Sequence, residues 1–133
     1  MNGVSLAVYC GPPLVDKYPG QTVSIRAIVK NTGTDIMTFY INICMKASDD
    51  TNWLCTPFSG TSFVPENPIT TPPVIMSLPA EWEGKYVDVG CFVYSDEART
   101  QLVLGGQGIC ASLFQVKQHI VVVAAEITQI MVT

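Results

Sequence analysis

The chain has 133 residues, the usual size of one domain, and a net charge of −4 from seven Lys and Arg against eleven Asp and Glu. The basic residues stand singly along the sequence, so the basic run or stripe of a protein that binds DNA or RNA directly is missing. Apolar residues make up 48% of the chain and charged residues only 14%, against about 25% in an average soluble domain.

The low charge content predicts that something other than water covers part of the surface. Large exposed apolar patches usually mark contact sites, so we expect assembly with further copies of the chain or with other structural subunits. A sandwich with large wet loops rich in Ser, Thr and Asn is the alternative.

Neither end of the sequence carries a targeting signal. The residues from Met1 to Cys10 lack the charged and apolar regions of a secretory signal peptide, so either the chain is made in the cytoplasm or Met1 was added to an excised domain. The apolar segment Ile120–Thr133 is interrupted by Glu126 and Gln129, and it is shorter than the roughly 20 residues of a membrane span. We therefore expect no transmembrane segment.

The first strands of the chain are predicted by alternation. Val4–Tyr9 alternates apolar and polar residues and stops at a Gly-Pro-Pro sequence, which cannot continue a ladder. A clearer strand, Thr22–Lys30, lies between two turns in the stretch Pro19–Thr34. Its period of two is typical of a strand with one buried and one wet side, with Ile28 as the exception. The residues predicted to face inward are Val23, Ile25, Ala27 and Val29.

The middle of the chain gives a third strand, Thr38–Lys46, and then a weaker pattern. A short strand is predicted at Asn52–Cys55, followed by a proline-rich extended loop, Thr56–Pro73, with a short edge strand at Thr61–Val64. Long loops inside compact domains are often functional, so this loop is a candidate contact surface; a passive connection is the alternative. The third strand places Phe39, Ile41, Ile43 and Met45 on one face.

Strand signals resume at Val74–Leu78 and Lys85–Tyr94, where Val87, Val89, Cys91 and Val93 alternate with polar or larger residues. A short strand at Gln101–Leu104, a hairpin turn at Gly105–Gly108 and a strand at Ile109–Val116 follow. The glycine cluster lacks the helix and the Lys-Ser/Thr pair of a phosphate-binding loop. The last strand places Ile109, Ala111 and Leu113 on one face.

The terminal segment Ile120–Thr133 differs from the other strands because apolar, β-branched residues occupy both faces from Ile120 to Val123. Such a strand must be covered on both sides, so we expect a neighbouring subunit to cover it. The interface candidates are Ile120, Val121, Val122, Val123, Ile127, Ile130 and Met131 in this segment, and Phe63, Pro65 and Pro68 in the proline-rich loop.

Five cysteines form no C-x-x-C pair, and with a single histidine they give no recognisable zinc site. Strand parity predicts that Cys91 is a core thiol and that Cys44 faces outward. Most of the five are expected to be buried free thiols. The sequence leaves the possibility of one disulfide, and Cys55 is the best candidate partner for another loop or outward cysteine. Such a disulfide would point to an oxidising environment or a hyperthermophile.

No constellation for catalysis or for a cofactor is present, so no catalytic, cofactor-binding or metal-binding residue is predicted and no small-molecule ligand is expected. His119, the sole histidine, is predicted to be a surface or interface residue. The loop carboxylates lack the spacing of a calcium loop and are expected to be solvated. Trp53, Trp82 and Tyr94 could form an aromatic sugar platform, but packing in the core or a corner is favoured.

About seven to nine short strands with regular turns predict one all-β domain over residues 1–133, a Greek-key β-sandwich of the immunoglobulin type, with a single jelly roll as the alternative. Pro19–Thr34 resembles the opening strand of CARDB-like, immunoglobulin-fold domains of prokaryotic surface proteins, and Trp82–Val89 resembles the turn and strand near their far end. The resemblance implies the fold and little about function. Tyr86 could serve as a tyrosine corner in such a domain.

These features favour a non-enzymatic structural protein. The expected role is a virion (capsid) subunit of a prokaryotic virus, archaeal viruses among them. The alternative is an adhesion or carbohydrate-binding module of a larger secreted protein at the cell surface.

Overall fold

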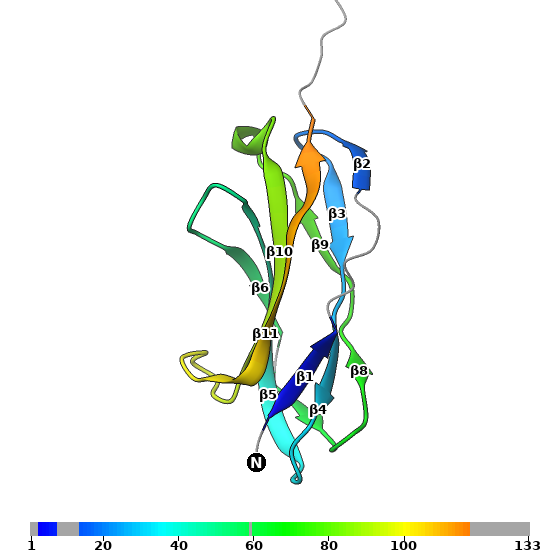
Figure 1. Cartoon of the computed structure of the whole chain (residues 1–133), viewed down its shortest axis with the longest axis vertical. Coiled ribbons are helices and arrows are strands. Elements are labelled where there is room, and N and C mark those ends of the chain that lie inside the picture. Colours follow the sequence, from blue (N-terminus) through cyan, green and yellow to red (C-terminus); the bar gives the residue numbers. More distant parts are fainter. Residues whose placement is uncertain (1–2, 8–13, 59, 118–133) are drawn as a thin grey trace, which may run out of the picture.

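The computed structural model describes residues 3–7, 14–58 and 60–117, and these residues form an all-β sandwich (Figure 1). One single-turn 3₁₀ helix, η1, interrupts the strands. The elements are β1 Val4–Ala7, β2 Leu14–Lys17, β3 Thr22–Ile25, β4 Ile28–Asn31, β5 Met37–Ala47, β6 Leu54–Pro57, β7 Thr61–Phe63, β8 Ile69–Thr70, β9 Val74–Ser77, η1 Ala80–Trp82, β10 Tyr86–Tyr94 and β11 Leu102–Val116.

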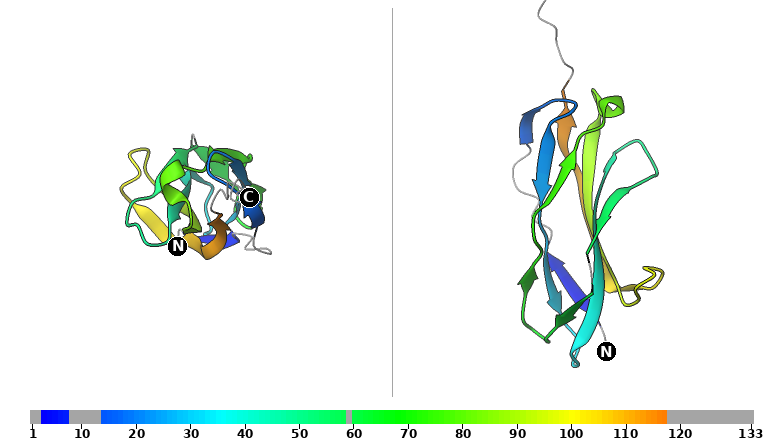
Figure 2. Two further views of the ribbon diagram at one scale, coloured as in Figure 1. Left: turned by 90° about the horizontal axis from the view of Figure 1, so that it is seen from above. Right: turned by 180° about the vertical axis from the view of Figure 1, so that it is seen from behind.

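The strands are arranged in two layers, which Figure 2 shows from above and from behind. One layer has the order β2-β11-β10-β5-β6, and β7 also pairs with β5. The other layer consists of the ladders β1-β4-β8 and β3-β9. This distribution of strands is that of an immunoglobulin-type Greek key rather than of a jelly roll. One layer contains β5, β10 and β11, and the other contains β1, β3–β4 and β8–β9. The predicted fold class is confirmed.

The core lies between the layers and is made by the alternating positions that the sequence predicts. Every second residue of a strand with one wet face points inward, so apolar side chains at those positions meet the opposite layer. Ile28, the exception in the pattern, is 41% exposed. The predicted inward residues are all buried: Val23, Ile25, Ala27, Val29, Phe39, Ile41, Ile43, Met45, Val87, Val89, Cys91 and Val93.

The layer that contains β1 is creased. The predicted strand Thr22–Lys30 is split into β3 and β4 at Arg26 and Ala27, and its neighbour is split at the same level into β8 and β9. At the crease the Ala27 N–H donates to the Thr71 hydroxyl at 3.0 Å, and the Thr71 N–H donates to the Ala27 carbonyl at 2.9 Å. A side chain therefore replaces one backbone acceptor of the ladder, which interrupts both strands together.

The glycine cluster Gly105–Gly108 lies inside β11, so the predicted hairpin turn at this position is wrong. Gly105 has φ +75°, and a Cβ there would lie 2.6 Å from the Val4 carbonyl oxygen. A Cβ on Gly106 would lie 2.8 Å from the carbonyl oxygens of both Val103 and Val93. These glycines therefore allow close approach of other backbone segments within a strand.

The β10–β11 turn lies earlier, between Ser95 and Gln101, whose N–H and carbonyl groups join across it at 3.0 Å. The Asp96 carboxylate accepts hydrogen bonds from the Thr100 hydroxyl and from the Gln101 N–H. These donors hold the pKa of Asp96 below its usual value. The turn is thus fixed by an aspartate rather than by glycines.

The proline-rich stretch Thr56–Pro73 is more ordered than predicted. The edge strand predicted at Thr61–Val64 is present as β7, whereas β8 was not predicted. Phe63 is fully buried and meets the Phe39 ring edge-on, at 5.4 Å between centroids. Phe63 is therefore a core residue, and its selection as an interface candidate is wrong. Pro65 is half-buried and Pro68 is exposed.

The buried aromatic residue at the connection before β10 is Trp82 and not Tyr86. Trp82, in η1, is 6% exposed and belongs to the core, whereas Tyr86 is 52% exposed. Tyr86 therefore does not act as a buried tyrosine corner. The predicted terminal strand, Ile120–Thr133, and His119 lie outside the described residues.

No helix within the described ranges is long and apolar enough to cross a membrane.

Candidate assembly surface

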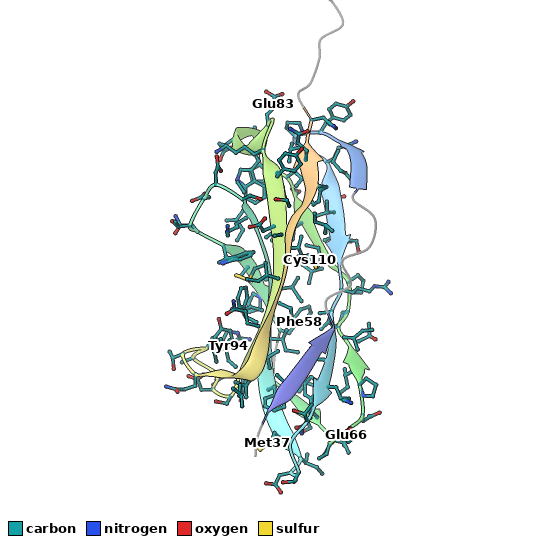
Figure 3. The ribbon with its side chains drawn as sticks, in the orientation of Figure 1. Met37, Phe58, Glu66, Glu83, Tyr94 and Cys110 are labelled. Carbon is teal, nitrogen blue, oxygen red and sulfur yellow. A yellow bond between two sulfur atoms is a disulfide. The ribbon has the colours of Figure 1, made fainter. Side chains whose placement is uncertain are left out.

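The solvent side of the layer β2-β11-β10-β5-β6 carries side chains from the positions that alternate with the core. We call the region formed by Tyr40, Asn42, Cys44, Lys46, Trp53, Asp88, Phe92 and Tyr94 the outer face. The register of β5 and β10 places these residues opposite one another: Lys46 pairs with Asp88, Asn42 with Phe92, and Tyr40 with Tyr94. Tyr94, labelled in Figure 3, lies next to the β10–β11 turn.

An aromatic pair occupies the middle of the outer face. The Trp53 and Phe92 rings meet edge to face, with centroids 5.3 Å apart and planes at 71°. A Cβ on Gly90 would lie 3.0 Å from the Phe92 ring and 3.2 Å from the Trp53 ring. The glycine therefore lets both rings lie down on the sheet. Both side chains remain partly exposed, so their outer surfaces are open to a partner.

A disulfide joins β5 to β6 beside the aromatic pair. Cys44 and Cys55 are directly opposite in the ladder, with Cα atoms 4.1 Å apart, and their sulfurs are bonded. The choice of Cys55 as a disulfide partner is confirmed. Cys44 lies on the outer side, as parity predicts, but it is fully buried rather than exposed.

The other two cysteines in the described residues are one free thiol and one disulfide-bonded residue. Cys91 is a free thiol in the core, as predicted, and its burial raises its pKa to about 12. Cys110 is disulfide-bonded. The expectation that most of the cysteines are free thiols is therefore wrong; Cys10 lies outside the described residues.

Asp88 is the centre of a polar cluster at one end of the outer face. Its carboxylate accepts hydrogen bonds from the Ser48 hydroxyl, from the Ser112 N–H at 2.8 Å and from Lys46 Nζ at 3.1 Å. Burial alone would raise the pKa of Asp88, but these three donors and the Lys46 charge outweigh it and lower the pKa below its usual value. The Asp88 and Lys46 side chains are only 12% and 15% exposed. The carboxylate is therefore ionised and fully used at neutral pH.

A bulge in β11 makes this cluster. Residues Ala111, Ser112 and Leu113 lie between the pairs Val89–Cys110 and Val87–Phe114, where β10 has only Asp88. Ser112 has φ +49°, which turns its N–H toward the Asp88 carboxylate. The bulge re-aims a backbone donor at a buried charge, a common use of bulges. Ile109 and Ala111 lie on the exposed side of the strand.

Lys46 links the polar cluster to the aromatic pair. Besides Asp88, its ammonium donates to the Asp50 carbonyl at 3.1 Å and lies 5.2 Å from the centroid of the Trp53 ring. A cation this close to a ring is attracted to its face. Lys46 is therefore committed to partners within the chain.

Arg99 fixes the opposite end of the outer face. Its Nε donates to Asn42 Oδ1 at 2.8 Å, and its two terminal nitrogens donate to the carbonyls of Glu97 and Phe58. The guanidinium also lies 5.7 Å from the Tyr40 ring centroid. Arg99 has φ +58°, a conformation held by these contacts.

The hydroxyl groups near Asp88 are engaged within the cluster. The Ser48 hydroxyl donates to the Asp88 carboxylate and lies 3.4 Å from the Ser112 hydroxyl. No group of three His, Cys, Asp or Glu side chains in residues 3–7, 14–58 and 60–117 is placed to hold a metal ion. Hollows of about 250 and 280 Å³ beside Arg99 and Ser48 are shallow surface depressions.

The predicted aromatic set is separated by the fold. Trp53 and Tyr94 share the outer face, whereas Trp82 is in the core. Sequence reasoning missed Phe92, the pair Lys46–Asp88 and Arg99. The signal for the first two was the polar side of the alternation in Thr38–Lys46 and Lys85–Tyr94, where a lysine, an aspartate and a phenylalanine occupy matching positions.

These features define a disulfide-braced β-sandwich of the immunoglobulin type with an aromatic outer face. No protein-family model and no curated protein matches the sequence.

Parts of three solved glycosidase structures align with this chain at TM-scores below 0.5. A putative β-galactosidase from Bacteroides fragilis aligns over 80% of this chain and 15% of that chain, with 11% identity and a TM-score of 0.49. A Bacteroides uniformis β-glucuronidase aligns over 80% and 12%, with 17% identity and a TM-score of 0.45. B. uniformis β-glucuronidase 2, covalently bound to cyclophellitol-6-carboxylate aziridine, aligns over 80% and 12%, with 16% identity and a TM-score of 0.45. The chain thus spans only a small part of each of these enzymes.

Proposed function

We propose that the protein is a non-enzymatic structural subunit that assembles with copies of itself or with other structural subunits through the outer face. The observation that carries this proposal is that the charged side chains around the aromatic pair already have partners within the chain. Lys46 is used by Asp88, Asp50 and Trp53, and Arg99 is used by Asn42 and two carbonyls. A partner covering Trp53 and Phe92 would therefore gain apolar contact without stripping water from an unpaired charge.

The proposed setting is the virion of a prokaryotic virus, with the chain as a capsid subunit. A disulfide between β5 and β6 supports a particle exposed to an oxidising medium or made in a hyperthermophile, where intracellular disulfides are also common. The low charge content of the chain supports extensive contact between subunits. The resemblance to CARDB-like domains of prokaryotic surface proteins fits the same exterior location.

The test is the assembly state of the full chain, measured by light scattering after size exclusion and by electron microscopy. We expect assemblies larger than a monomer, and a Trp53→Ser/Phe92→Ser variant that remains folded and dissociates. Ile36→Ser is the matched control, because Ile36 is 65% exposed and lies off the outer face. A wild-type chain that stays monomeric at all concentrations would overturn the proposal.

An adhesion or carbohydrate-binding module is the second candidate, and the shared exposure of Trp53, Phe92 and Tyr94 favours it. Aromatic faces are the usual stacking surface for sugar rings. For this function we expect a monomer whose Trp53 fluorescence changes when polysaccharide is added, and a Trp53→Ser variant that no longer binds polysaccharide. Binding that persists in Trp53→Ser would contradict this role for the outer face.

A further inference from the structure

The free edge of β9 lies in the layer opposite the outer face. β9 pairs with β3 on one side, and no second strand pairs with it among the described residues. The Leu78 N–H donates to the Gln21 carbonyl, which makes Leu78–Gln21 a hydrogen-bonded pair of this ladder. Because such pairs alternate in antiparallel ladders, the N–H and carbonyl groups of Ile75 and Ser77 point away from β3.

The edge is protected by its shortness, four residues in the segment between Pro73 and Pro79, but by no charge, proline or bulge within the strand itself. β9 has the sequence Val-Ile-Met-Ser, without Lys, Pro or a bulge, and the Ile75 side chain is 69% exposed. Natural edge strands normally carry charges, proline or bulges that discourage pairing with another chain. An uncharged edge with free donors and acceptors is therefore suited to accept a strand.

An apolar cavity lies on the other side of the crease from β9, beside β8 and Pro72. Its volume is about 150 Å³, and its lining includes Ile41, Phe58, Phe63, Ile69 and Pro72. A dry apolar cavity of about 150 Å³ is large enough to hold a benzene-sized group. One branched aliphatic side chain of a strand lying along β9 would fit it.

The sequence beyond the described residues has the composition of such a strand. Residues 118–133 include four consecutive β-branched residues, Ile120–Val123, and a single carboxylate, Glu126. A strand with apolar residues on both faces is stable only when it is covered on both faces. Strand addition at a sheet edge, with side chains entering a pocket, provides this cover.

We propose that residues 118–133 of one copy add as a strand to the free edge of β9 in a second copy, with an apolar side chain in the 150 Å³ cavity. This inference rests on the proposed function, since it names the segment and the edge that join two subunits. It adds a second contact, distinct from the outer face.

The reach of the chain favours a second copy over the same copy. β11 ends at Val116 in the layer opposite β9, and Lys117 is tied to the Lys17 carbonyl at 2.8 Å. Crossing one layer and two strand spacings takes about 14 Å, from sheet and strand spacings of about 10 and 4.8 Å. The three backbone steps from Lys117 to Ile120 span only about 10 Å. Ile120 therefore falls short of its own β9 edge, so pairing of the whole run Ile120–Val123 with β9 needs the edge of a second copy.

The test uses two full-length variants that fail in complementary ways. Ile75→Pro removes an outward N–H from the acceptor edge, which a proline tolerates because that N–H is not used by β3. Val121→Asp/Val123→Asp disables the donor segment. We expect each variant alone to lose the assemblies that depend on strand addition, and an equal mixture to form a heterodimer in light scattering. Ile75→Ala, which keeps the N–H, is the matched control and should assemble as the wild type does.

Folding is checked by circular dichroism and by the intact Cys44–Cys55 disulfide. If Ile75→Pro does not fold, the second arm adds the Val121→Asp/Val123→Asp chain to wild type, where it should shorten assemblies because it accepts a strand without donating one. Wild-type-like assembly of folded Ile75→Pro, or no shortening in the second arm, overturns the inference and leaves the proposed function standing. A monomeric wild type overturns both.

Discussion

The two layers of the sandwich are built in different ways. In the layer β2-β11-β10-β5-β6, three strands run for 11, 9 and 15 residues and are braced by a disulfide, an ion pair and an aromatic pair. In the opposite layer no strand exceeds four residues, and the crease at Ala27 and Thr71 interrupts it. Both layers have edge strands among the described residues, β2 and β6 in the first layer and β9 in the second, but only the first layer is braced by contacts across its strands.

The two layers obtain their stability from different sources. The layer β2-β11-β10-β5-β6 is stabilised by a disulfide, an ion pair and an aromatic pair, which can be removed separately. The layer with β1, β3, β4, β8 and β9 is stabilised mainly by the core beneath it. Four sets of substitutions test this contrast, in order of decreasing cost in stability.

Phe63→Ala should lower the free energy of unfolding by about 3–5 kcal/mol, because it empties a fully buried site between the layers. The adjacent Val64→Ala is the control; Val64 is 49% exposed, so a loss of about 0.5 kcal/mol or less is expected. Urea unfolding measures both. Equal effects of the two substitutions would restore Phe63 as a surface residue.

Removing the brace with Cys44→Ala/Cys55→Ala should cost about 3 kcal/mol, since the disulfide closes a loop with a sequence separation of 11. The measurement is denaturant unfolding without reductant. Leu54→Ala on the same strand, at a 44% exposed position, should cost less than about 1 kcal/mol. A double variant as stable as the wild type would mean that the ladder alone holds β6.

Asp88→Asn should destabilise the protein by about 1–3 kcal/mol at neutral pH, because Lys46 and the Ser112 N–H lose a charged acceptor. The folded-state pKa of Asp88 is lowered, so its stabilising contribution is present above the unfolded value, near pH 4, and is lost as pH falls through the folded value.

The measurement for Asp88 is the difference in unfolding free energy between wild type and variant, which should shrink on acidification below about pH 4. Asp49→Asn is the control, because the ion pair of Asp49 with Lys85 is exposed and such pairs contribute about 0–1 kcal/mol. A difference that stays constant with pH would rule out the carboxylate as the source.

Thr71→Val should cost about 1–2 kcal/mol, because it leaves the buried Ala27 N–H at the crease without its acceptor. Thr71→Ser keeps the hydroxyl and should recover most of the loss. Thermal unfolding of the two variants gives the comparison. If both variants behave alike, the crease is held by packing and not by this hydrogen bond.

The inward residues could be predicted because the period of two needs only local sequence. Positions 23–29, 39–45 and 87–93 each alternate against a single buried face, and each was assigned correctly. The core thiol Cys91 and the outer-side position of Cys44 followed from the same parity, whereas Cys55 was selected as a disulfide partner from its place at a predicted loop.

The features that were missed depend on segments far apart in the sequence. Gly105 is needed because β1 passes close to it, and the local sequence alone reads as a turn. Asp88 meets Ser112 only because β11 bulges, and a bulge has no periodic signature. Phe63 is followed by Val64 in a stretch of polar residues and prolines, so no alternation marks Phe63 as the buried one of the two.

Two parallel pairings with β11, the Gly3–Leu104 bridge beside β1 and the ladder with β2, determine how the sandwich responds to tension. Val4 begins β1 near one end of the molecule, and β11 finishes at Val116 near the other, with both strands pointing the same way along the long axis (Figure 1). Tension applied between Gly3 and Val116 would therefore act in shear on the Gly3–Leu104 bridge, and the β2–β11 ladder would share the load in the same geometry. Bonds loaded in shear must yield together, whereas a peeled hairpin opens one bond at a time. The sandwich is thus oriented to carry force from end to end.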